Sequence, residues 1–145
     1  MPANDIFRAM YQRYALFRGA EDAYTLTGGT ASAAGGDGRM YRTIAKPKAD
    51  RPYIVMSAVG GTLFWMFGNK QIERQRVQLM VIADHDDDAR PAGAIWDSLV
   101  KRFENADLLF TDGTHIVMRR ESMPIETVDT DVVQLSGDWF LEQQT

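Results

Sequence analysis

Two stretches of the chain repeat apolar residues at intervals of three and four, the spacing that places them on one face of a helix. The first covers residues 3–17, where Asn4 or Asp5 can accept hydrogen bonds from the free amides of the first turn and Gly19 is a plausible stop. The second follows an acidic cluster and runs to about Phe103. The predicted apolar stripes are Ile6, Phe7, Met10, Tyr11, Tyr14 and Phe17 in the first helix and Ala92, Ile95, Trp96, Leu99, Val100 and Phe103 in the second.

Between the helices, apolar residues at alternate positions predict a hairpin with strands at residues 52–59 and 74–83 and a tip at residues 60–69. Successive side chains of a strand point to opposite faces, so one face of each strand is expected to be buried. On the return strand this face is Val77, Leu79 and Val81, and we expect the matching face of the first strand to be Tyr53, Val55, Ser57 and Val59.

The last third of the chain predicts a second hairpin. A short extended piece at residues 108–110 precedes a strand at residues 115–122, a loop at residues 123–130 and a closing strand at residues 131–141. Gly137, inside the closing strand, indicates a bulge. The residues of the closing strand expected to face the core are Val133, Leu135, Trp139 and Leu141.

The order of these elements predicts an α+β fold. We expect an antiparallel sheet of about four main strands with two long helices packed largely on one face. With 145 residues the chain is most simply one domain, residues 1–145. Residues 27–38 form a loop rich in glycine and alanine, in which we expect mobility.

The predicted hairpin tip carries five consecutive large apolar residues. They cannot all fold back onto one core, because alternate side chains point to opposite faces. An exposed apolar patch usually marks an interaction surface, although the first helix or the closing strand can also cover both faces. The candidate interface residues are Leu63, Phe64, Trp65, Met66 and Phe67.

An acidic cluster at residues 84–88 is the strongest candidate for a metal-binding or catalytic site in the sequence. Its four carboxylates and one imidazole could bind a divalent cation, but the spacing and the glycine of an EF-hand loop are missing. Because the cluster directly precedes a helix, we interpret it as a cap that opposes the positive end of the helix dipole. Its residues are Asp84, His85, Asp86, Asp87 and Asp88.

Composition argues against several other functions. The chain has no cysteine, so thiolate chemistry and disulfides are excluded. Its net charge of -4 disfavours a nucleic-acid binder, although a local basic face on the predicted strands stays open. No catalytic residue, cofactor site or metal site emerges, and His85 and His115 are interpreted as solvated or capping histidines. We expect no signal peptide and no membrane-spanning segment. The residues of the possible basic face are Arg74, Arg76, Arg119 and Arg120.

Several of these segments, in this order, resemble the tail terminator or tail-completion proteins of long-tailed bacteriophages and related gene-transfer particles. The first is the extended piece at residues 38–41, followed by the strand Asp50 to Met56 with its proline, aromatic and aliphatic residues. A return strand over residues 76–84, acids and a helix come next. A late strand with Arg119, Arg120, Glu121 and Ser122 and a closing strand with Asp138, Trp139, Phe140 and Leu141 complete the pattern.

The resemblance implies a structural virion protein and no enzyme. Such a subunit forms a ring, usually a hexamer, that caps the tail tube, ends tube polymerisation and provides the face that joins the head. Its partners would be further copies of itself, the tube protein and the head–tail connector, with DNA passing through the lumen without sequence recognition. No cofactor is implied, and the expected place is the head-proximal end of the tail, assembled in the host cytoplasm.

Two alternatives stay open. The chain could be another connector or neck protein of the same particle. It could also be a small metal- or ligand-binding α+β domain that uses the acidic cluster at residues 84–88.

Overall fold

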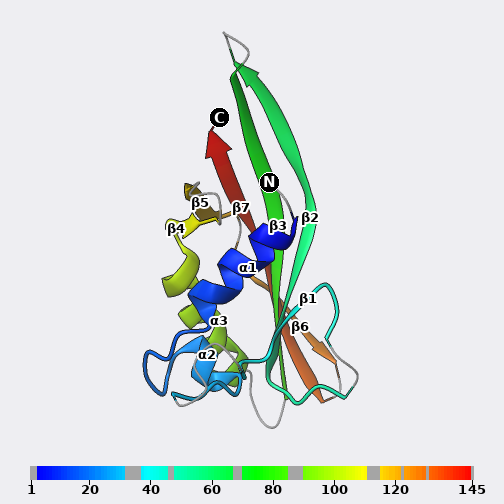
Figure 1. The fold of residues 1–145 in the computed structure, drawn as a ribbon. Coiled ribbons are helices and arrows are strands. Elements are labelled where there is room, and N and C mark those ends of the chain that lie inside the picture. Colours follow the sequence, from blue (N-terminus) through cyan, green and yellow to red (C-terminus); the bar gives the residue numbers. More distant parts are fainter. Residues whose placement is uncertain are drawn as a thin grey trace.

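A computed structural model shows that the protein is mostly sheet, with short helices on one side (Figure 1). The helices are α1 (Ala3–Tyr14), α2 (Ala23–Leu26) and α3 (Arg90–Phe103). The strands are β1 (Met40–Arg42), β2 (Tyr53–Met66), β3 (Lys70–Asp84), β4 (Ala106–Leu109), β5 (His115–Arg120), β6 (Ile125–Asp129) and β7 (Val132–Gln144). The structure describes residues 3–31, 37–45, 48–66, 70–84, 90–110, 115–121, 123–129 and 131–144.

The seven strands form one curled, mixed sheet in the order β1-β2-β3-β7-β5-β4, with β6 also paired to β7. The expectation of about four antiparallel strands under two long helices is therefore wrong. β1 pairs in parallel with β2, and the segment expected to be a loop contains β6, which pairs with β7. The three helices have 12, 4 and 14 residues. Short extended segments join the sheet because pairing satisfies their backbone groups, even without an alternating pattern.

The core lies between the inner face of the sheet and the helices. α3 packs on β3, β5 and β7, and α1 lies against α3 and β4. Trp139 of β7 is fully buried, with the rings of Trp96 and Phe103 each 6.3 Å from its own. The two helical stripes are confirmed except at Phe17, which lies beyond the end of α1 and is 45% exposed.

The buried face of β3 is confirmed, but the matching face of β2 is the opposite of the one expected. The register places Ile54 opposite Val81 and Met56 opposite Leu79. Directly opposed residues share a face, so Ile54 and Met56 enter the core. Of the face expected to be buried, Val55 is buried, whereas Val59 is 45% exposed. The four core residues expected on the closing strand, Val133, Leu135, Trp139 and Leu141, are all buried.

The bulge in this sheet lies in β2 and not at Gly137. Pairing of β3 with β7 continues in register past Leu79 and Gly137. The register of β2 with β3 shifts between Ala58 and Gly61, at Gly60, whose φ of 109° few other residues adopt. Residues 60–66 of the expected tip are therefore strand, and residues 67–69 lie outside the described residues.

Gly137 leaves space for an aromatic ring. A Cβ atom at this position would lie 2.6 Å from Cη2 of Trp96, far inside van der Waals contact. The glycine thus lets α3 approach the sheet closely through Trp96.

We predict that Gly137→Ala destabilises the fold by about 1–3 kcal/mol, because the methyl group forces the Trp96 ring to move. Gly93→Ala is the matched control. A Cβ atom at Gly93 in α3 meets open space, so this change should stabilise the protein by up to about 1 kcal/mol. Thermal unfolding of both variants measures the difference, and equal stability of Gly137→Ala and the unmodified chain would contradict the packing described.

Candidate functional site

The hairpin of β2 and β3 extends as an arm, and β7 pairs with β3 along it as far as Ile72 (Figure 1). Its strands stay paired out to Met66 and Lys70, whereas β1 accompanies β2 only over residues 54–56. Within the described chain, the outer edge of β2 beyond Met56 therefore has no strand beside it. Such an edge presents a row of free backbone donors and acceptors.

Four of the five candidate interface residues lie on this arm. Leu63, Phe64, Trp65 and Met66 belong to β2, while Phe67 lies outside the described residues. In the register, Phe64 is opposite Ile72 and Trp65 is opposite Gln71. Their role as an interface stays a prediction.

The acidic cluster is described only at its first residue. Asp84 ends β3, and its Oδ1 lies 2.9 Å from Nε of Arg51, so this carboxylate is engaged in an ion pair. Residues 85–88 lie outside the described residues, and the capping interpretation stays untested. No three His, Cys, Asp or Glu residues of the described chain are grouped as metal ligands.

The structure describes both ends of the glycine-rich loop at residues 27–38. Residues 32–36 of the glycine-rich loop lie outside the described residues, but its ends are tied by Asp37, which accepts hydrogen bonds from Tyr24 Oη at 2.8 Å and Thr30 Oγ1 at 3.0 Å. The hydrogen bond from Tyr24 lowers the pKa of Asp37.

Of the two histidines, His115 is exposed, with Nδ1 3.0 Å from Asp107 Oδ2. His85 lies outside the described residues.

The possible basic face is largely neutralised. Arg74 Nη2 lies 2.9 Å from Glu142 Oε2, and Arg76 Nη2 lies 2.7 Å from Glu121 Oε1. Both guanidinium groups also lie over the ring of Phe140, at 4.9 and 5.3 Å.

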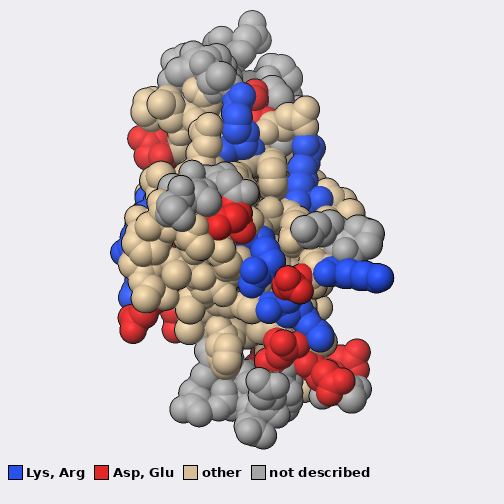
Figure 2. Space-filling model, turned by 60° about the horizontal axis from the view of Figure 1, so that its bottom comes forward, with Lys and Arg blue, Asp and Glu red and all other residues tan. Residues whose placement is uncertain are grey.

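The other two arginines of the possible basic face differ in their contacts. Arg120 pairs with Glu104 at 3.1 Å, while Arg119 is exposed. In the view of Figure 2, acidic and basic side chains are interspersed and neither sign covers the visible face. On this face the arrangement is unlike the continuous basic stripe of a nucleic-acid binder.

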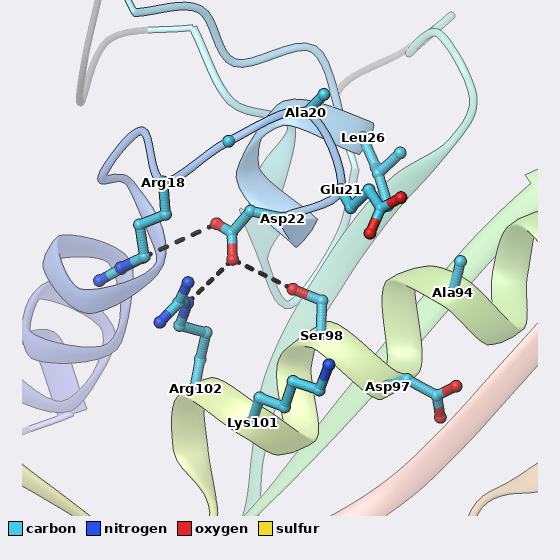
Figure 3. Close-up of a pocket in the computed structure, with 11 residues that line it drawn as sticks. Arg18, Ala20, Glu21, Asp22, Leu26, Ala94, Asp97, Ser98, Lys101 and Arg102 are labelled. Atoms are coloured by element: carbon cyan, nitrogen blue, oxygen red, sulfur yellow. Dashed lines mark hydrogen bonds and ion pairs between the residues drawn. The ribbon is translucent and has the colours of Figure 1, made fainter.

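A surface hollow of about 660 Å³ lies between α3 and the segment that joins α1 to α2 (Figure 3). Its floor holds Asp22, whose side chain is 5% exposed. Oδ1 of Asp22 accepts hydrogen bonds from Arg102 Nε at 2.8 Å and Ser98 Oγ at 3.2 Å, and Nη1 of Arg18 lies 3.7 Å from Oδ2. The charged residues of the lining are Arg18, Glu21, Asp22, Asp97, Lys101 and Arg102.

This cluster fixes the segment before α2 onto α3. Ser98 Oγ also accepts a hydrogen bond from the backbone N–H of Ala23 at 2.7 Å, so one hydroxyl connects two parts of the chain. Burial, followed by repulsion from Arg102, lowers the pKa of Arg18. Three basic and three acidic side chains line the hollow, which gives no net charge for binding an ion. Sequence reasoning missed this cluster because Asp22 and Arg102 are 80 residues apart.

We predict that Asp22→Asn lowers the free energy of unfolding by about 1–3 kcal/mol, because Arg102 and Arg18 lose their counter-charge. The loss is kept below that of a fully buried pair because the Arg102 side chain is 31% exposed. Asp97→Asn, on the exposed rim of the same hollow, is the control and should change stability by less than about 0.5 kcal/mol. Urea unfolding compares the two, and equal midpoints would show that the Asp22 carboxylate does not stabilise the fold.

None of the described helices combines the length and the apolar character needed to span a membrane.

Comparison with known proteins shows similarity in fold. A chain from the virion of a native gene transfer agent particle superposes with a TM-score of 0.70 at 13% identity, over 99% of this chain and 97% of that chain. A second solved structure, whose name states no function, gives a TM-score of 0.58 at 17% identity over 97% and 96% of the two chains. No protein-family model and no curated protein matches the sequence. The shared fold thus covers almost the whole length of each chain.

Proposed function

We propose that this protein is a structural component of a phage-like virion that assembles into a ring, most simply a hexamer, at the head-proximal end of the tail. The ring ends polymerisation of the tail tube and provides the face that joins the head. The observation that supports this most strongly is the similarity in fold, over nearly the full length of both chains, to a component of a gene transfer agent virion. The tail-terminator resemblance of the sequence supports the finer assignment.

The shape of the subunit supports assembly over catalysis. A ring requires two different patches on each subunit, because every contact joins one patch to the other. The arm formed by β2 and β3 extends away from the core and carries consecutive large apolar residues, which suits a contact with a neighbouring subunit or with the tube. We propose no catalytic role, since the buried Asp22 of the hollow is held in ion pairs that serve the fold.

Passage of DNA through the lumen is compatible with the charges. The chain is weakly acidic, and Arg74 and Arg76 are paired with carboxylates. Unpaired basic side chains would hold the phosphates by releasing counterions and would slow transit.

The first test is the assembly state and its effect on the tube. We predict that the purified protein forms a discrete ring-sized oligomer by light scattering, and that substoichiometric amounts stop the growth of tubes formed by the tube protein of the same particle. A chelator should change neither result, whereas a loss of stability on chelation would favour the metal-binding alternative. A ring that leaves tube growth unaffected would favour another neck protein, and a monomer without any effect on tubes would overturn the proposal.

The second test concerns the arm. We predict that Trp65→Ser combined with Phe67→Ser leaves a folded protein that no longer assembles or stops tube growth, because the apolar contact is removed. Leu16→Ser combined with Phe17→Ser is the matched control, since these residues are 52% and 45% exposed after α1, away from the arm. Size-exclusion chromatography with light scattering gives the assembly state. Unchanged assembly of the arm variant would exclude the arm as an interface.

A further inference from the structure

The half of the sheet away from the arm has two open edges. One row of paired residues runs from Met40 through Ile54, Val81 and Leu135 to Glu126, which crosses β1, β2, β3, β7 and β6 in that order. In the described chain, neither β1 nor β6 has a strand on its outer side. The two edges therefore bound the same five-stranded region and face outward from it.

These two edges carry opposite charges. Residues 39–51, which contain β1, hold five basic side chains and one acidic, whereas residues 121–131, which contain β6, hold four acidic side chains and no basic one. We call the two segments the basic edge and the acidic edge. In the sequence, the charged residues of the two segments are Arg39, Arg42, Lys46, Lys48, Asp50 and Arg51 in residues 39–51 and Glu121, Glu126, Asp129 and Asp131 in residues 121–131. Of these, Lys46 lies outside the described residues.

Part of this charge is already used within the subunit. Arg51 pairs with Asp84, and Glu121 pairs with Arg76. Arg42 and Lys48 on the basic edge, and Glu126 and Asp131 on the acidic edge, are exposed, and none of these four forms an ion pair within the described residues. Each edge thus presents two charges without an ion-pair partner in the described residues, although Nη1 of Arg42 donates a hydrogen bond to Oδ1 of Asn4.

Both edges also expose apolar side chains. Among the residues whose side-chain exposure is described, Ile44, at 78%, Met123, at 72%, and Ile125, at 69%, are the most exposed large apolar ones. Ile44 follows β1, and the other two lie directly before and at the start of β6. All five residues of β6 are exposed, which is an unfavourable arrangement for a strand that contains Ile125 and Val128 unless another surface covers it.

We propose that the basic edge of one subunit binds the acidic edge of a second copy of this chain, so that the sheets of neighbouring subunits continue into one another around the ring. The proposal rests on the ring assembly put forward above and names its subunit interface. β6 runs opposite to β1, so joining the two edges with strand directions kept gives an antiparallel pair. Ile44 then faces the apolar residues at the start of β6, whereas Lys48 and Asp131 lie at opposite ends of the antiparallel pair. Each of the four charges without an ion-pair partner thus lies along an edge of opposite sign.

The test exchanges the charges and uses mixing as the readout. The acidic-edge variant carries Glu126→Lys and Asp131→Lys, so positions 42, 48, 126 and 131 are all basic. The basic-edge variant carries Arg42→Glu and Lys48→Glu, so the same four positions are all acidic. Each variant alone should be folded by circular dichroism and should lose the ring at concentrations where the unmodified protein is fully assembled.

An equimolar mixture of the two variants should recover the ring, because at positions 42, 48, 126 and 131 every contact then joins basic to acidic side chains. The two variants must then alternate around the ring, which an even number of subunits, as in a hexamer, allows. The control is Glu21→Lys with Asp97→Lys, which changes the net charge by the same amount at exposed positions of the hollow and should leave the ring intact. The same samples are compared in the tube-growth assay, so the result does not depend on a ring that is stable without the tube.

The outcomes separate this interface from the ring itself. Variants that assemble alone as the unmodified protein does, or folded variants that do not recover assembly when mixed, would overturn the interface and leave the proposed ring standing. An unmodified protein that neither forms a ring nor stops tube growth would overturn the proposed function.

Discussion

The rest of the structure depends on the antiparallel pairing of β3 with β7, which runs in register from Asp84 and Val132 to Ile72 and Gln144. It joins the first hairpin to the end of the chain and places two buried strand faces side by side under α3. Without β7, β2 and β3 would have only the three residues of β1 beside them, and a two-stranded ribbon is marginally stable in water. Gly137 of β7 contributes to this packing, because it leaves space for Trp96 to reach the sheet beside Trp139.

The sequence predicted the elements whose pattern is local and strong. The stripes of α1 and α3 and the buried faces of β3 and β7 repeat with the period of their own element. The prediction of the buried face of β2 was wrong because both faces of this strand are apolar. Tyr53, Val55 and Val59 alternate with Ile54 and Met56, so a pattern shifted by one residue fits equally well. β1 and β6, of three and five residues, are too short and too exposed to show a period.

The candidate surfaces also differ in whether the sequence alone reveals them. The five residues of the predicted hairpin tip stand out in the sequence because they are consecutive, whereas the opposite charges of the two sheet edges acquire meaning only through the strand order. Residues 39–51 and 121–131 are far apart in the chain, and nothing local in either segment shows that they bound one sheet. The ion pair of Asp22 with Arg102 is hidden by the same kind of separation.

Charged edge strands usually protect a protein from pairing with others, because like charges repel when identical edges meet. Here the protection is selective. Two basic edges repel and two acidic edges repel, which disfavours a two-fold contact that joins the same edge of both subunits, while unlike edges attract. Head-to-tail contacts generate either a closed ring or an open filament, depending on the rotation from one subunit to the next. The curl of the sheet between β1 and β6 sets the angle between the two edges, so the same feature that makes the fold a half-open barrel determines whether such contacts can close.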